Sequence, residues 1–255
     1  MKTDRRGFLK IGCLGILGFA AGPLVDILLR GRTAEALPEL PAAATAGKRW
    51  AMAVNVNKCK NGCRDCINIC HSVHNVPDFG NPKDEVKWIW EEPYRKVFPE
   101  QEQEFGARGN MPVVVLCNHC DNPPCVRVCP TKATFKRKDG IVAMDYHRCI
   151  GCRYCMAACP YGARSANWRD PRPFIRKINP GFPTRMKGVV EKCDFCVERI
   201  TRGLIPACVE ACKEKALVFG NLKDPGAELR EILRANHTLR RRPELGTVPQ
   251  VYYIV

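Results

Sequence analysis

Residues 149–160 read CIGCRYCMAACP, and this stretch decides the fold. Its cysteines are spaced C-x2-C-x2-C-x3-C and a proline follows, which is the run that holds cubane [4Fe–4S] clusters in bacterial electron carriers. The spacing keeps three thiolates in one tight loop, and the proline ends the short helix that carries the fourth. The stretch therefore predicts an iron–sulfur site.

Working outward from this stretch, three more groups of four cysteines end in the same Cys-x3-Cys. The group at 117–129 carries two extra residues, the group at 59–70 carries one, and the group at 193–212 has an 11-residue spacer before its third cysteine. The candidate ligands are Cys59, Cys63, Cys66, Cys70, Cys117, Cys120, Cys125, Cys129, Cys149, Cys152, Cys155, Cys159, Cys193, Cys196, Cys208 and Cys212. Sixteen thiolates are the complement of four [4Fe–4S] clusters, which are the cofactors we predict.

Other uses of these cysteines fit the pattern less well. Zinc sites use paired C-x2-C units, whereas here three close cysteines recur with a fourth after three residues. Cysteines three apart in one tight loop mostly cannot meet disulfide geometry. No nucleophile–base pair, phosphate loop or carboxylate pair indicates a catalytic residue. We therefore expect an electron-transfer protein rather than an enzyme in its own right.

The N-terminus carries the features of an export signal. Residues 3–10 (TDRRGFLK) precede an apolar stretch from Ile11 to Leu29, as in a twin-arginine leader, and Ala34-Glu35-Ala36 offers a cleavage site. Such a route carries a folded protein with its clusters already loaded. The sequence predicts a peripheral protein in the periplasm or on the extracytoplasmic face of the membrane. A retained membrane anchor is the alternative.

The formal net charge is +15, counted with neutral cysteines. An oxidised cubane with four thiolates carries about −2, so four would bring about −8 into the interior. Much of the basic excess can balance these clusters. Nucleic acid is not expected as a partner of an exported protein.

A short extended segment precedes every cysteine group, and these segments are Ala51–Val54, Val113–Leu116, Ile141–Met144 and Val189–Val190. Strand, cysteine loop and short helix thus form a unit that is repeated four times. Residues 133–142 carry a hairpin signal, and a matching strand is expected at Ala216–Phe219. We expect an α+β fold of two interlocked bacterial-ferredoxin-like modules, one inserted in the other, with long loops.

The composition divides the chain into four parts. Residues 1–36 are expected to be the signal peptide, 37–49 a linker, 50–224 the four-cluster ferredoxin-like domain with its inner module at about 112–165, and 225–255 a C-terminal helix and tail. Leu229, Ile232 and Leu233 have helical spacing in that last part. The apolar end at 251–255 is either a core strand or a partner contact.

The fourth cysteine of each run in two-cluster ferredoxins ligates the cluster of the other run. The second and third groups lie close in sequence and are expected to pair, which leaves the first and fourth to pair with each other. The four expected ligand sets are Cys59, Cys63, Cys66 and Cys212; Cys193, Cys196, Cys208 and Cys70; Cys117, Cys120, Cys125 and Cys159; and Cys149, Cys152, Cys155 and Cys129.

Two long excursions, at 71–111 and 160–188, either carry contacts or cover clusters from water. The histidines His71, His74, His119 and His147 are expected to bond backbone or sulfur rather than metal, because the cysteine count is complete. The basic side chains Lys60, Arg64, Arg127 and Arg153 lie near ligands and either raise cluster potentials or solubilise the surface.

The four groups, the long spacer and the leader resemble the iron–sulfur subunits of the dimethyl-sulfoxide-reductase and nitrite-reductase-associated (NrfC-type) families over nearly all of residues 50–220. Residues 57–63 (NKCKNGC) and 74–77 (HNVP) look closest to the DsrO subfamily, the periplasmic subunits of DsrMKJOP membrane complexes. The extra residue in the first group departs from the commoner spacing of the wider family.

This resemblance implies a place in a sulfur-metabolism complex of the kind used in sulfate respiration. The implied partners are a quinone-reactive, NrfD-like (DsrP-like) integral membrane subunit, a multihaem cytochrome c (DsrJ-like) and other subunits, including a heterodisulfide-reductase-like one. The chain would then relay electrons between the membrane subunit and the cytochrome or another redox partner. The alternative is the iron–sulfur subunit of a molybdopterin oxidoreductase.

Overall fold

The computed structural model describes residues 47–100 and 109–255. The predicted signal peptide and most of the predicted linker, residues 1–46, lie outside the described residues.

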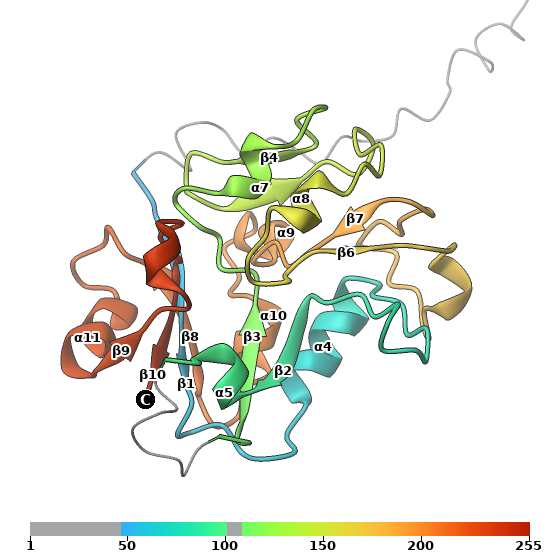
Figure 1. The fold of residues 1–255 in the computed structure, drawn as a ribbon. Helices are drawn as coiled ribbons and strands as arrows, with labels where there is room; N and C mark the ends of the chain where they lie inside the picture. The colour runs from blue at the N-terminus through green and yellow to red at the C-terminus, as the bar shows by residue number, and fades with distance from the viewer. Residues whose placement is uncertain (1–46, 101–108) are drawn as a thin grey trace, which may run out of the picture. The chain divides into compact units, whose positions relative to one another are not determined.

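The described part alternates short strands and short helices (Figure 1). The strands are β1 (Trp50–Asn55), β2 (Ile89–Pro93), β3 (Pro112–Leu116), β4 (Thr134–Lys136), β5 (Val142–Met144), β6 (Ser165–Ala166), β7 (Val190–Glu191), β8 (Leu217–Asn221), β9 (Thr238–Leu239) and β10 (Val251–Ile254). The helices are α4 (Asp65–Val73), α5 (Tyr94–Val97), α7 (Pro124–Arg127), α8 (Tyr154–Ala157), α9 (Val197–Ile200), α10 (Ala207–Glu210) and α11 (Glu228–Ala235), with 3-10 turns η1 (Arg172–Phe174) and η2 (Pro243–Leu245). None of these helices is long and apolar enough to cross a bilayer.

A four-stranded sheet in the order β8-β1-β10-β9 joins the two ends of the described chain (Figure 1). β1 pairs with β8 antiparallel and with β10 parallel. Val251 and Tyr253 of β10 are fully buried. The apolar C-terminus is therefore a core strand, which decides between the two possibilities that the sequence left open.

Both faces of β1 are covered, because alternate residues of a strand point to opposite sides. Met52 and Val54 face the main core, whereas Ala51 and Ala53 face α11. Leu229 of α11 lies so close to β8 that a Cβ on Gly220 would stand 2.9 Å from the Leu229 Cβ. The glycine thus permits the close approach of helix and sheet.

The remaining strands form three two-stranded sheets. β4 and β5 are the predicted hairpin between the second and third cysteine groups. β2 pairs with β3, and β6 pairs with β7. A strand therefore precedes each cysteine group, as the repeated pattern predicted, and the result is a ferredoxin-like fold of mixed helix and strand content.

A short helix carries the third cysteine of every group: Cys66 in α4, Cys125 in α7, Cys155 in α8 and Cys208 in α10. Prolines start two of them, since Pro124 opens α7 and Pro206 precedes α10. α4 packs against α10, and α7 packs against α8. The helix of the first group thus contacts that of the fourth, and the second group's helix contacts the third's.

The two long excursions pack into the core. Trp88 of the first is fully buried, and its ring meets Phe182 of the second edge-on, with 5.8 Å between centroids. Arg185 of the second excursion is also buried and donates hydrogen bonds to the carbonyl oxygens of His74 (2.5 Å) and Asn75 (2.9 Å). These contacts lie within the protein, and both roles considered for the loops, contact with partners and cover of the clusters from water, stay predictions.

Candidate iron–sulfur sites

The first cysteine set lines a cavity of about 210 Å³. Its cysteines are Cys59, Cys63, Cys66 and Cys212, which come from the first group and from the end of the fourth. The cavity is far larger than the roughly 30 Å³ that one water occupies. Val54, Val114 and Leu217 supply apolar wall, and the structure thus brings together the four side chains of one predicted ligand set.

A second set lies around a shallow hollow in the inner part of the chain. Cys149, Cys152 and Cys155 line it together with Cys129, the last cysteine of the preceding group. The loop is held close to the following hairpin, because a Cβ on Gly151 would stand only 2.6 Å from the Gly188 carbonyl oxygen. Gly151 also has φ +70°, a conformation that glycine adopts without strain.

A third set is fully buried. Burial raises the pKa of the Cys70 thiol well above its usual value, and the neighbouring Cys193, Cys208 and Cys196 raise it further. Cys70 and Cys66 lie about one helical turn apart on α4, so this helix reaches from the first set to this one. The structure therefore places Cys70 with the fourth group.

The fourth set belongs to the second and third groups. Burial raises the pKa of the Cys120 thiol to about 12, and Cys117, Cys125 and Cys159 are among the neighbours that raise it. Burial also raises the pKa of the Cys159 thiol, and Cys117 is the neighbour that raises it most. The last cysteine of the third group therefore lies with the second group.

Charge interactions between cysteines of different sets indicate which sets are neighbours. Burial raises the pKa of Cys66 to about 12, and Cys208 of the buried set is its next largest influence. Burial and then Cys117 raise the pKa of Cys193. Because charge interactions fade with distance, these neighbours mark adjacent sets. Cys125 of the Cys117 set likewise acts on Cys155 of the Cys149 set. These neighbours indicate the order Cys59 set, Cys193 set, Cys117 set and Cys149 set.

Two buried cations lie beside this row. Lys192 is fully buried and donates to the carbonyl oxygens of Cys193 (2.7 Å) and Val142. Arg164 is 4% exposed and donates from Nη2 to Cys125 Sγ at 3.0 Å. Burial opposes the charge on Arg164, but Cys125, Cys155 and Cys117 outweigh burial and raise its pKa. No pattern in the sequence predicts that Lys192 and Arg164 are buried.

The residues present fit iron–sulfur clusters. Neither Lys192 nor Arg164 forms an ion pair with a carboxylate within residues 47–100 and 109–255. A buried cation without a counter-charge is costly. Clusters held by the neighbouring thiolates would supply negative charge beside both. The raised pKa values of the buried thiols mean that metal binding must displace their protons.

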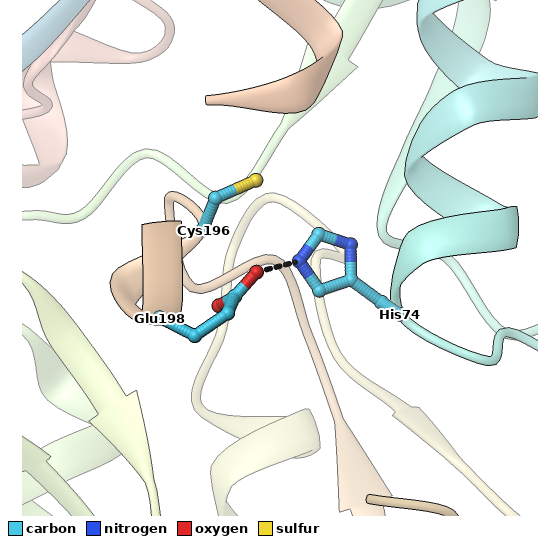
Figure 2. Close-up of side chains that lie close together, drawn as sticks. All are labelled: His74, Cys196 and Glu198. Atoms are coloured by element: carbon cyan, nitrogen blue, oxygen red, sulfur yellow. Dashed lines mark hydrogen bonds and ion pairs between the residues drawn. The ribbon is translucent and has the colours of Figure 1, made fainter. Parts of the chain in front are cut away.

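His74 joins Cys196 and Glu198 in one buried corner (Figure 2). Its Nε2 lies 3.1 Å from Glu198 Oε1, and its Nδ1 lies 2.9 Å from the Cys70 carbonyl oxygen. Burial works to lower the pKa of His74, but Glu198 and Asp194 raise it above its usual value. Because Cys196 also faces Cys70, this trio forms one side of the buried set.

Of the other histidines singled out in the sequence, His119 has clear structural partners. The Val142 backbone N–H donates to His119 Nδ1 at 3.1 Å, as expected for a backbone contact, and the His119 ring stacks on Phe195 with 3.7 Å between centroids. Burial holds the pKa of His119 well below its usual value, and nearby Lys192 lowers it further. Burial also lowers the pKa of His71 to about 4. His147 is exposed.

The four basic residues singled out in the sequence lie at the surface. Lys60 pairs with Glu214 at 2.5 Å, and Arg64 pairs with Glu91 at 3.5 Å. Arg153 lies over the Trp168 ring at 4.6 Å, and Arg127 is exposed. Their charges are paired or screened by water, unlike that of Arg164.

Known proteins resemble this chain over most of its length. The 4Fe-4S dicluster domain family matches residues 112–173 and 180–222. The Hdr-like menaquinol oxidoreductase iron-sulfur subunit 1 of Archaeoglobus fulgidus is 43% identical over 92% of this chain and 93% of its own. The menaquinone reductase iron-sulfur cluster-binding subunit of Nitratidesulfovibrio vulgaris is 35% identical over 81% and 88%. Protein NrfC of Escherichia coli K12 is 36% identical over 100% and 96%.

Proposed function

The chain belongs to the 4Fe-4S dicluster family of NrfC-type and menaquinol-oxidoreductase iron–sulfur subunits, and from this premise we propose that it relays electrons through four [4Fe–4S] clusters. It is an electron-transfer subunit of an oxidoreductase complex and is not itself the catalytic chain. The observation that supports four clusters is the row of four cysteine sets. When bound, each cluster supplies one-electron transfer.

The proposed ligands are the sixteen cysteines in crossed sets. Support comes from the cavity at the Cys59 set and the hollow at the Cys149 set, each lined by cysteines of two paired groups, and from the neighbours of Cys70 and Cys120. The proposed sets are Cys59, Cys63, Cys66 and Cys212; Cys193, Cys196, Cys208 and Cys70; Cys117, Cys120, Cys125 and Cys159; and Cys149, Cys152, Cys155 and Cys129.

Two interlocked modules are the proposed architecture of the domain at 50–224, with the inner module at about 112–165. The pairing of β1 with β8 and of α4 with α10 supports an outer module, and the β4–β5 hairpin with α7 and α8 supports an inner one. β2–β3 and β6–β7 each join a strand beside the inner groups to a strand of the outer ones. These shared sheets make separate folding of the modules unfavourable.

The two ends of the row are the proposed points of exchange with partners. The Cys59 and Cys149 sets each contain three half-buried cysteines, whereas all four cysteines of the Cys193 set are buried. The proposed partners are an NrfD-like, quinone-reactive membrane subunit and a multihaem cytochrome c. Membership of the DsrO subfamily is part of the proposal. Export by the twin-arginine leader and a peripheral periplasmic location belong to the same proposal.

Metal analysis of the purified protein tests the number of clusters. We expect about 16 iron and 16 acid-labile sulfide per chain, since each cubane holds four of each. Zinc without sulfide would overturn the relay function. Purification from membranes with its bound subunits tests the partners, and a molybdopterin protein in place of the NrfD-like subunit would refute the proposed complex.

A further inference from the structure

We propose that Arg164 sets the reduction potentials of the clusters at the Cys117 and Cys149 sets above the potential at the Cys59 set, an inference that rests on the proposed four-cluster function. Arg164 lies where these two inner sets meet. Its Nη2 lies 3.0 Å from Cys125 Sγ of one set, and Cys155 of the other is among its nearest charged neighbours.

The charge of Arg164 acts with little screening. The side chain is 4% exposed, and no carboxylate pairs with it in the described part of the chain. Charge interactions are several times stronger in the protein interior than in water. A cation and a hydrogen bond to ligand sulfur both favour the more negative, reduced state of a cluster. Both effects therefore raise the potential.

Thr134 holds the guanidinium in place. Its Oγ1 donates its single proton to the Ala143 carbonyl oxygen at 3.2 Å and accepts from Arg164 Nη2 at 2.7 Å. Met144 Sδ lies 3.2 Å from Nη1 and occupies the other side of the fork. The orientation of the cation toward the ligand sulfur is thus fixed by the β4–β5 hairpin.

The repeat shows what is special about this position. Five residues after the last cysteine of each group stand Asn75, Thr134, Arg164 and Leu217. The equivalent of Arg164 in the fourth group is therefore the apolar Leu217, which lines the Cys59 cavity. At this position of the repeat, the inner module has the cationic side chain of Arg164, whereas the outer module has the apolar side chain of Leu217.

The other sets have their cations compensated. At the Cys59 set, Lys60 pairs with Glu214 and Lys213 pairs with Asp65, and both lysines are more than two-thirds exposed. At the Cys193 set, Glu198 pairs with His74, and the carboxylate of Asp194 lies near Lys192 although beyond ion-pair distance. Only the inner pair of sets thus has a buried cation with no carboxylate beside it in the described residues.

The test is an EPR-monitored redox titration of the cluster-loaded protein. The variants Cys63→Ser and Cys152→Ser identify the signals of the two end sites. In the unchanged protein the signal at the Cys149 set should titrate at the higher potential. Arg164→Gln should lower the one-electron equilibrium constant of reduction at the inner sets about tenfold, which is about 59 mV, and leave the Cys59 signal in place.

Matched variants separate charge from structure. Arg164→Lys keeps the charge and should retain most of the potential. Thr134→Val keeps Arg164 but removes the hydroxyl that positions the guanidinium, and it should give a smaller shift in the same direction. Arg172→Gln removes an exposed arginine that pairs with Asp170 and should shift nothing. If Arg164→Gln does not fold, Thr134→Val still tests the proposal.

Two results would overturn it: inner potentials that do not move in Arg164→Gln or Thr134→Val, or a Cys149 signal below the Cys59 signal in the unchanged protein. Iron and sulfide analysis of the same samples keeps this outcome apart from failure of the proposed function. A protein without clusters refutes the function, whereas a loaded protein with unmoved potentials refutes only the role of Arg164.

Discussion

Arg185 and Glu191 form an ion pair in which both side chains are fully buried, with 2.5 Å between Nη2 and Oε2. Trp88 Nε1 donates to the same carboxylate at 3.0 Å, and Asn167 Nδ2 donates to its other oxygen at 2.5 Å. The pair therefore ties both long excursions to β7, directly before the fourth cysteine group.

Removing one partner of this pair should destabilise the protein strongly. Arg185→Met leaves the Glu191 carboxylate buried without its cation, and we expect the free energy of unfolding to fall by about 3–5 kcal/mol. The double variant Arg185→Met/Glu191→Gln should lose less, because no lone charge remains. Anaerobic urea unfolding measures both, with Arg172→Met as the exposed control. A single variant as stable as the control would contradict the finding.

Gly151 should be indispensable to the Cys149 set. In Gly151→Ala the new methyl group would stand 2.6 Å from the Gly188 carbonyl oxygen, so the cysteine loop must move. We expect the protein to lose the iron and sulfide of one cluster. Gly162→Ala is the matched control, because Gly162 has a similar φ of +64° but no atom within 4 Å of the added Cβ. It should cost only about 1–2 kcal/mol of left-handed strain and keep all its iron.

The crossed ligand sets predict which variants share a lost signal. Cys70→Ser should perturb the same EPR signal as Cys196→Ser, because both side chains belong to the buried set. Cys66→Ser, only four residues away from Cys70, should perturb a different signal. If Cys70→Ser and Cys66→Ser affect the same cluster, the four groups each hold their own cluster and the crossed assignment is wrong.

His71 should make the folded state sensitive to mild acid. Burial lowers its pKa to about 4, below the unfolded value near 6.5. Between pH 6.5 and pH 4 the unfolded chain binds more protons than the folded protein. The free energy of unfolding therefore falls as the pH drops through this range, by about 3 kcal/mol in total. His71→Gln should flatten the fall in unfolding free energy between pH 7 and 5.5. An unchanged slope in this variant would show that His71 is not the group responsible.

The local pattern of the sequence was sufficient to predict the cysteine groups, the strand before each group and the hairpin at 133–142. These features depend on near neighbours: cysteine spacing, proline positions and turn residues act within a few residues of one another. The family was also recognisable from the groups. The DsrO assignment, the number of clusters and the export route stay predictions.

Tertiary structure decided what distant segments do to one another. The apolar end at 251–255 forms a core strand because it pairs with β1, and both faces of the sheet are covered there. In the sequence, Arg164 and Lys192 are simply two of 41 basic residues, and only packing shows that they are buried beside cysteines with no carboxylate within ion-pair distance. Burial and electrostatic environment depend on contacts across the chain, which spacing along it does not encode.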